Sequence, residues 1–265
     1  MVEQLLEKVE DHKVEDHNIP DDHYIPDANL LITEDDTPVD NFPSAKQQRL
    51  LISSLYSSQQ QPFLAEANVG IYHTDGEPAI VPDVFISFDV QTPPDWWKKQ
   101  NRCYMVWKFG KSPELVMEIV SNTEGEELTK KLKIYERMKV NYYLVYDPNQ
   151  QLGEEKLTIY QLGGRNYFKT NETWLTDINL GVTFWEGEFE GRTDTWLRWC
   201  DQNGTVIATG DERAESEKLE KEEAQKLAES EKVAKEEAQR VAQCRTTDRL
   251  INRGTFWDMR ELADI

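Results

Sequence analysis

Residues 115–146 read LVMEIVSNTEGEELTKKLKIYERMKVNYYLVY, and this stretch decides the fold class. It begins and ends with apolar runs, residues 115–120 and 142–146, of the length and composition of buried strands. Between them, residues 122–139 carry apolar side chains at helical spacing: Leu128, Leu132, Tyr135 and Met138. A strand, a helix and a second strand in this order are typical of an α/β domain.

Further predicted elements lie on both sides of this stretch. A helix is predicted over residues 44–58, with Ser44 as its N-cap and apolar residues at helical spacing. Strand-like runs occupy residues 63–72, 80–87, 104–109, 157–162 and 167–169. The order of these elements predicts an α/β domain with a mixed central sheet, which we place in residues 44–200.

The first 43 residues differ from the rest in composition. They carry 13 acidic and 2 basic side chains and few aromatic residues, which predicts an acidic, largely disordered leader over residues 1–43. The leader contains three histidines, His12, His17 and His23. We interpret them as part of a solvated acidic segment rather than as a metal site.

Residues 201–265 are predicted to form a charged helical tail. Within it, AESEKLEKEEAQKL at residues 214–227 is repeated as AESEKVAKEEAQRV at residues 228–241. Oppositely charged residues four positions apart, such as Glu217 and Lys221, support a helix. The large apolar residues of the repeat are 8, 6 and 8 positions apart, which is a poor coiled-coil seam. We therefore favour an extended ion-paired helix over a stable coiled coil.

The charge of the chain bears on its partners. The formal net charge is −20, which argues against a protein that coats nucleic acid electrostatically. Residues 44–200, however, carry 17 basic and 21 acidic side chains, which leaves room for a local phosphodiester site. No apolar run reaches membrane-spanning length, and the acidic N-terminus lacks the pattern of a signal peptide. We expect a soluble, cytoplasmic protein without a membrane partner.

Three residues are candidates for catalysis. Asp83 follows a proline at the start of an apolar run, and Glu118 stands inside LVMEIV, where an ionised side chain is costly unless it is paired or bound to metal. On a helical wheel, Lys131 falls beside the apolar stripe, whereas Lys130 and Lys133 point to solvent. If the two strands are neighbours, the three side chains can converge on one Mg²⁺ or Mn²⁺ ion. Such a cluster suits phosphodiester hydrolysis.

Each candidate also has a purely structural interpretation. Asp83 can be an ordinary strand-start residue, Glu118 a paired carboxylate, and Lys131 the partner of Glu127 four positions before it. The adjacent Trp96 and Trp97 can stack on bases, but a position in the core or at an interface is the more common role of tryptophan.

The same residues carry a resemblance to a known family. VPDVFISFDV and PELVMEIVSNTEGEELTKKLKIYERMKVNYYLVYDP resemble the cyanobacterial branch of the Uma-two family of restriction endonucleases, within the PD-(D/E)xK nuclease superfamily. The motifs occur in the family's order: PDV, then EIVS, then K-x-x-x-Y, then a strand that ends in Asp-Pro. The resemblance spans residues 36–162, about half of the chain.

The resemblance implies a fold, an activity and a site. The fold is a restriction-endonuclease-like core, with a helix, a mixed central sheet and a second helix, to which this chain adds the C-terminal extended helix. The implied activity is metal-dependent cleavage of DNA, with homodimers common in the superfamily. Asp83, Glu118 and the carbonyl of Ile119 would hold Mg²⁺ or Mn²⁺, and Lys131 would assist the attacking water. The superfamily lysine two residues after the glutamate is replaced by Val120, so the family draws its lysine from the following helix.

Two other classes of function remain open. One is a catalytically silent nuclease fold that binds or scaffolds a partner through its charged helical tail. The other is a metal-dependent hydrolase of small phosphate esters, which would need the same three residues and a closed pocket.

Overall fold

A computed structural model describes residues 41–121 and 126–261, with side chains through residue 240. Its largest unit is a six-stranded sheet with the order β1-β3-β5-β6-β7-β8. These strands are Phe63–Glu66 (β1), Val84–Phe88 (β3), Leu115–Ile119 (β5), Tyr142–Tyr146 (β6), Leu157–Gly163 (β7) and Asn166–Thr170 (β8). Strands β5 and β6 are parallel and the other neighbours are antiparallel, so the sheet is mixed, as predicted.

The remaining elements are helices and two small sheets. The sheets consist of β2 and β4, which pair in parallel, and of β9, β10 and β11, which are antiparallel. Their strands are Ile71–Tyr72 (β2), Tyr104–Met105 (β4), Trp174–Leu175 (β9), Leu180–Phe189 (β10) and Arg192–Cys200 (β11). The main helices are Phe42–Ser58 (α1), Val106–Phe109 (α2), Leu132–Met138 (α3) and Gly210–Glu261 (α4). A π-helical turn, Glu127–Lys131, leads into α3.

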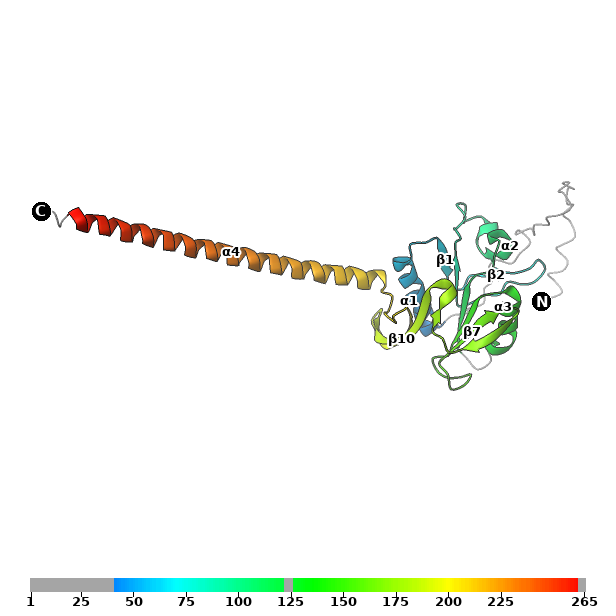
Figure 1. Cartoon of the computed structure of the whole chain (residues 1–265). Helices are drawn as coiled ribbons and strands as arrows, with labels where there is room; N and C mark the ends of the chain where they lie inside the picture. Colours follow the sequence, from blue (N-terminus) through cyan, green and yellow to red (C-terminus); the bar gives the residue numbers. More distant parts are fainter. Residues whose placement is uncertain (1–40, 122–125, 262–265) are drawn as a thin grey trace.

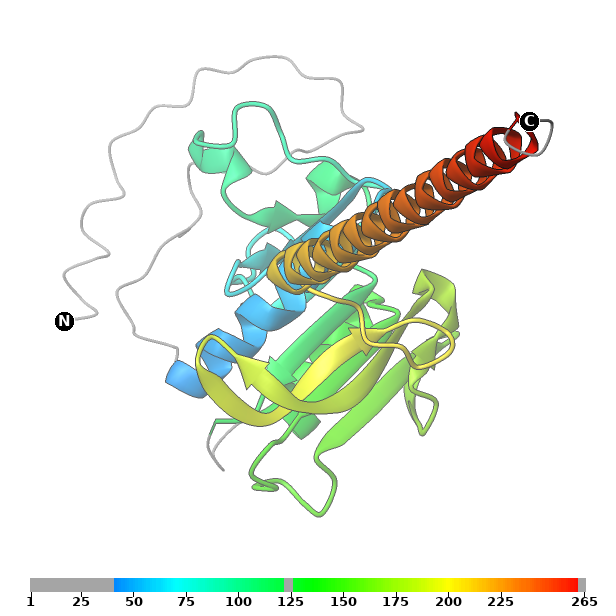
Figure 2. The same cartoon turned by 90° about the vertical axis from the view of Figure 1, so that its left-hand side faces the viewer.

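Both faces of the central sheet are covered. On one face, α1 and the β9–β11 sheet enclose a core that contains Leu51, Met117 and Trp199. In Figure 2, α1 (blue) and this small sheet (yellow) lie on the same side of the central strands (green). On the opposite face, Val116 packs with Tyr135 of α3. The neighbours Val116 and Met117 thus face opposite layers, as alternation along a strand requires.

Helix α4 extends away from this domain (Figure 1). It has 52 residues and is therefore about 78 Å long. Its side chains from residue 213 to residue 240 are exposed. This confirms the extended helix predicted for the tail, which runs from Gly210 to Glu261.

The start of α1 differs from the prediction. Asn41, not Ser44, is the N-cap, because the side chain of Asn41 accepts a hydrogen bond of 2.9 Å from the backbone N–H of Ser44. This choice places Pro43 in the first helical turn, where its missing N–H costs nothing. The predicted end of the helix at Ser58 is confirmed.

Two predicted strands are shorter than expected. The run over residues 63–72 divides into β1 and β2, because Asn68 between them has a left-handed backbone with φ of 56°. The run over residues 104–109 is β4 followed by the short helix α2, which ends at Gly110 with φ of 76°. The run over residues 80–87 is confirmed only from Val84, and β9–β11 were not predicted at all.

The predicted apolar stripe of the helix over residues 122–139 is wrong at its start. Leu128 is exposed, whereas the adjacent Glu127 is buried. The cause is the π-helical turn, in which the N–H of Lys131 donates to the carbonyl of Glu126, five residues back, at 3.0 Å. This wider turn rotates Glu127 towards the sheet.

The two adjacent tryptophans are not in the core. Trp96 and Trp97 are exposed and pack edge to face, with ring centroids 5.9 Å apart. Their loop follows Phe88, at the end of β3 opposite to Asp83. Residues 1–40 of the predicted leader, with its three histidines, lie outside the described residues, so for them the leader stays a prediction. Its last three residues, 41–43, instead belong to the N-cap and first turn of α1.

Candidate active site

Asp83 and Glu118 lie at the same edge of the central sheet. Strands β3 and β5 are antiparallel neighbours, and Val84 is paired with Met117. The residue before Val84 is therefore opposite the residue after Met117, which brings Asp83 next to Glu118. The condition set by the sequence, that the two strands be neighbours, is met.

The carboxylate of Asp83 is held by two donors from different elements. Its Oδ2 accepts a hydrogen bond of 2.6 Å from the backbone N–H of Ile119 in β5. Its Oδ1 accepts a hydrogen bond of 2.9 Å from the side-chain amide of Gln48 in α1. Gln48 in turn accepts a hydrogen bond of 3.2 Å from Asn68. Asp83 is thus fixed by a polar network that joins α1, β5 and the β1–β2 turn.

Glu118 is buried in the core that faces α3, with 2% of its surface exposed. Its Oε1 accepts a hydrogen bond of 2.7 Å from the hydroxyl of Tyr135. Its Oε2 forms an ion pair of 2.8 Å with Nζ of Lys131. Both oxygens of this carboxylate therefore have partners on the π-helical turn and α3, which lie over the end of β5.

Lys131 contacts two carboxylates. Besides the ion pair with Glu118, its Nζ lies 3.6 Å from Oε1 of the buried Glu127. The other oxygen of Glu127, Oε2, is buried without a hydrogen-bond partner. By contrast, Lys130 is exposed and pairs with Glu126, and Lys133 is exposed. The helical wheel therefore identified the lysine that reaches the sheet, although the wheel took Leu128 as part of the buried stripe and Leu128 is not buried.

Burial dominates the electrostatics of this cluster. It raises the pKa of Glu118 to about 8, against the opposing effect of Lys131 and with a further rise from the nearby charge of Asp83. Burial also lowers the pKa of Lys131, but the charge and hydrogen bond of Glu118 outweigh it, so that pKa is raised overall. The pKa of Tyr135 lies well above its usual value because the hydroxyl is buried beside Glu118. Lys131 and Tyr135 thus stay protonated near neutral pH and serve as donors.

The donor set fits a hard divalent cation. Within the described ranges, no group of three or more histidine, cysteine, aspartate or glutamate side chains is arranged around a metal position. Mg²⁺, however, commonly keeps several waters and takes only one or two carboxylates from the protein. Asp83, Glu118 and the carbonyl of Ile119 would supply oxygen ligands of this kind.

Two contributors to the cluster were missed from the sequence. Gln48 lies three and seven residues before Leu51 and Leu55, so it is on the buried face of α1. A polar residue on an apolar stripe was the available signal. Glu127 was considered only as a partner for Lys131, and its burial depends on the π-helical turn, which has no clear sequence signature.

Comparison with known proteins places the chain in a family. The sequence model of the Uma2 family, described as "Putative restriction endonuclease", matches residues 31–179, more than half of the chain. The matched range contains Asp83, Glu118 and Lys131, and it ends before β10, β11 and α4. No protein of curated function matches the sequence. Among the described residues, none of the helices is long and apolar enough to cross a membrane. The chain belongs to the Uma2 family.

Proposed function

We propose that this protein is an Mg²⁺- or Mn²⁺-dependent endonuclease that hydrolyses phosphodiester bonds of DNA, with Asp83, Glu118 and Lys131 as its catalytic residues. Membership of a family described as restriction endonucleases supports a nuclease-type function. The observation that carries the proposal is Glu118, a buried carboxylate next to Asp83 and paired with Lys131. A buried ionisable group with a shifted pKa and a specific charged partner is common at sites that perform chemistry.

Each residue has a defined part in the proposed reaction. Asp83, Glu118 and the Ile119 carbonyl would hold the cation, which supplies Lewis-acid activation of the phosphate and of water when bound. The ammonium of Lys131 would turn from Glu118 to a phosphate oxygen and stabilise the charge that develops there. The oxygen of water forms the new bond to phosphorus and releases one proton to solvent, while the bond to the leaving sugar oxygen breaks and that oxygen takes up a proton from solvent.

The surrounding residues hold this geometry in place. Tyr135 keeps Oε1 of Glu118 oriented, and Gln48 with the N–H of Ile119 fixes Asp83. Glu127 offers Lys131 a second carboxylate at 3.6 Å, so the ammonium stays near the site after it leaves Glu118. These contacts come from α1, β5 and α3, so we expect the proposed catalytic side chains to be held in fixed positions.

The first experiment compares cleavage of supercoiled and linear DNA by wild type, Glu118→Ala and the surface control Lys130→Ala, with Mg²⁺ or Mn²⁺ at several ionic strengths. The proposal expects cleavage by wild type and Lys130→Ala and none by Glu118→Ala. Equal cleavage by all three would place the activity elsewhere or in a contaminant. No cleavage by any of them would overturn the proposal.

A binding or scaffolding role without cleavage is the second candidate. It is favoured by α4, whose exposed length is far greater than the proposed site needs. We also propose that the protein self-associates and is cytoplasmic. The chain would consist of a domain over residues 44–200 and a tail over residues 201–265. Sedimentation of the full chain at several concentrations would test self-association, and limited proteolysis would test the boundary near residue 200.

A further inference from the structure

A cavity of about 680 Å³ is lined in part by Ile119, whose carbonyl is one of the proposed cation ligands. Its walls come from four segments that are distant in sequence: the first turn of α1, residues 119–121 after Glu118, the end of β6 with the loop that follows, and the start of β11. Pockets of roughly 300–1,000 Å³ typically enclose a single small ligand. The cavity is therefore large enough for one nucleotide.

Two residues connect this cavity with the proposed site. Ile119 lines the cavity, and its backbone N–H donates to Asp83. Gln47 also lines it, and the adjacent Gln48 donates to the other oxygen of Asp83. A ligand in the cavity would thus lie against Ile119, although Asp83, Glu118 and Lys131 themselves do not line the cavity.

Aromatic side chains form part of the wall. Trp196 and Tyr146 are buried and fixed, since Nε1 of Trp196 donates to the carbonyl of Gly187 at 3.1 Å and the hydroxyl of Tyr146 donates to the carbonyl of Thr195 at 3.5 Å. Phe42 lines the same cavity but is 91% exposed. A planar ligand in the cavity could therefore pack on Phe42, next to a wall that Trp196 and Tyr146 keep rigid.

Basic side chains accompany the aromatic ones. Lys46, Lys156 and Arg192 line the cavity, and Asp194 is the only acidic residue among its described lining residues. Lys156 is exposed, and Arg192 is held only by a 3.3 Å contact with Asp194 on the same strand. Lys156 and Arg192 can turn to a phosphate, whereas Lys46 pairs with Glu190. Aromatic faces next to cations are the combination with which proteins bind unpaired nucleotides.

The wall formed by the β10–β11 hairpin is firmly attached. Gln47 makes two hydrogen bonds with the backbone of Leu197, at 2.7 and 3.1 Å. At the hairpin tip, Lys46 and Arg49 of α1 both pair with Glu190. The hairpin begins at Leu180, after the last residue that the family model matches. This wall is thus built by a part of the chain that the family match does not cover.

We propose that this cavity binds one unpaired nucleotide of a DNA strand next to the scissile phosphate, with its base against the aromatic wall and its phosphate at Lys156 and Arg192. The inference rests on the proposed function and extends it to a substrate class, single-stranded or locally unpaired DNA. A base in a duplex must leave its stack and its partner to enter such a cavity, whereas a base in a single strand need not.

The test measures binding without cleavage. Fluorescence anisotropy in EDTA compares a labelled 12-nucleotide oligo-dT with a labelled 12-base-pair duplex on the full chain. We expect the single strand to bind at least about tenfold more tightly. Lys156→Ala/Arg192→Ala should weaken single-strand binding and lower the slope of log K against log salt by about 0.7, the value for one phosphate that is no longer neutralised. Phe42→Ala should weaken it about tenfold without a change in slope.

The control is Lys218→Ala/Lys221→Ala, which removes two exposed lysines of α4 and should leave binding unchanged. Equal binding of single strand and duplex, the same loss in the α4 control, or no binding of the oligo-dT would each overturn the inference. The proposed function is judged separately, by cleavage. If the protein cleaves DNA and neither binding nor cleavage depends on Lys156 and Arg192, the nucleotide-binding role of the cavity is rejected and the nuclease function stands. If single-strand binding depends on these residues but no DNA is cleaved, the nuclease function is rejected and the binding role stands.

Discussion

Lys131 and Glu118 form an ion pair of 2.8 Å although they belong to different elements, the π-helical turn and β5. In the proposed site, this contact would take the place of a lysine at the superfamily position. Val120, which occupies that position, belongs to the same core layer as the α3 residues Tyr135 and Met138. A lysine on the turn that leads into α3 approaches the Glu118 carboxylate from the helical layer that covers the sheet. A lysine at position 120 would instead approach it from the strand.

The first prediction concerns this lysine. Lys131→Ala should reduce Mg²⁺-dependent DNA cleavage by at least about a hundredfold, because it removes the cation that faces the developing charge. Lys130→Ala and Lys133→Ala should cleave at nearly the wild-type rate, since both side chains point to solvent. Initial rates of plasmid cleavage would check this. Similar rates for Lys131→Ala and the two neighbours would contradict the assignment.

The second prediction concerns pH. Without metal, the pKa of Glu118 is raised to about 8 from an ordinary value of 4.5, so between these values the folded state binds more protons than the unfolded state. The free energy of unfolding should therefore fall as pH rises from 5 to 8, by up to about 1.4 kcal/mol for each unit of pKa difference. Glu118→Gln has no such proton and should show a flatter dependence.

Urea denaturation in EDTA at a series of pH values would measure this difference. Glu77→Gln is the matched control, because Glu77 is an exposed carboxylate paired with Arg137. A slope for Glu118→Gln as steep as that of wild type would show that Glu118 does not titrate in this range.

The third prediction concerns Gln48, which positions Asp83. Gln48→Ala removes the 2.9 Å hydrogen bond and should raise the Mg²⁺ concentration for half-maximal cleavage several-fold, with a smaller effect on the rate at saturating Mg²⁺. Gln60→Ala, at an exposed position after α1, is the control. An unchanged Mg²⁺ requirement would show that the N–H of Ile119 is sufficient to hold Asp83.

The central strands and the candidate triad were predictable because their patterns are local. The runs around Glu118 and Tyr143 are continuous and apolar, and such runs in a β-α-β order leave few arrangements. Lys131 could be chosen because helical geometry fixes the direction of side chains within about one turn.

The features that were missed depend on contacts between distant parts of the chain. The hairpin β10–β11 carries Trp185, Trp196 and Trp199, and residues 196–200 of β11 are all buried where this strand packs on α1, with Nε1 of Trp199 donating to the carbonyl of Leu51. The π-helical turn places Glu127 in the interior, where its local sequence predicts a solvated side chain. Neither feature could be inferred from the spacing of residues alone.

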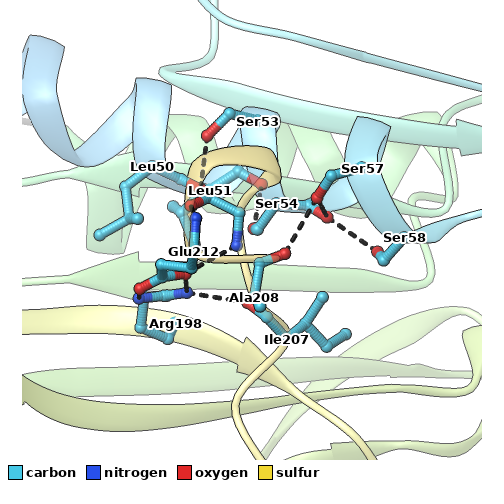
Figure 3. A network of polar contacts seen from close by, with 11 residues as sticks. Leu50, Leu51, Ser53, Ser54, Ser57, Ser58, Arg198, Ile207, Ala208 and Glu212 are labelled. Carbon is cyan, nitrogen blue, oxygen red and sulfur yellow. Dashed lines mark hydrogen bonds and ion pairs between the residues drawn. The ribbon is translucent and has the colours of Figure 1, made fainter. Parts of the chain in front are cut away.

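The fourth prediction concerns the junction between α4 and the domain (Figure 3). Arg198 of β11 is 1% exposed, and its guanidinium makes two hydrogen bonds with Glu212, at 3.0 and 2.7 Å. Glu212 also accepts from the N–H of Thr209, whose hydroxyl accepts from the N–H of Glu212, so the two form a capping box at the start of α4. Glu212→Ala should lower the free energy of unfolding by about 2 kcal/mol or more, because it leaves a buried guanidinium without its partner.

Chemical denaturation of the full chain would measure this loss. Glu223→Ala, an exposed glutamate of α4, is the control and should stay within about 0.5 kcal/mol of wild type. Equal stability of the two variants would show that Arg198 is satisfied by other contacts, such as the carbonyl of Ile207 and the ring of Trp185.

The last prediction concerns Lys139, which ends α3 in a left-handed conformation with φ of 63°. Side chains other than glycine and asparagine are strained there, at a cost of about 1–2 kcal/mol. Lys139→Gly relieves this strain but loses a hydrogen bond to the carbonyl of Arg165, so we expect a stability equal to or slightly above that of wild type. Lys133→Gly, within α3, should instead destabilise by about 1 kcal/mol. Thermal unfolding of both variants checks the contrast, and similar losses at both positions would show that Lys139 is not strained.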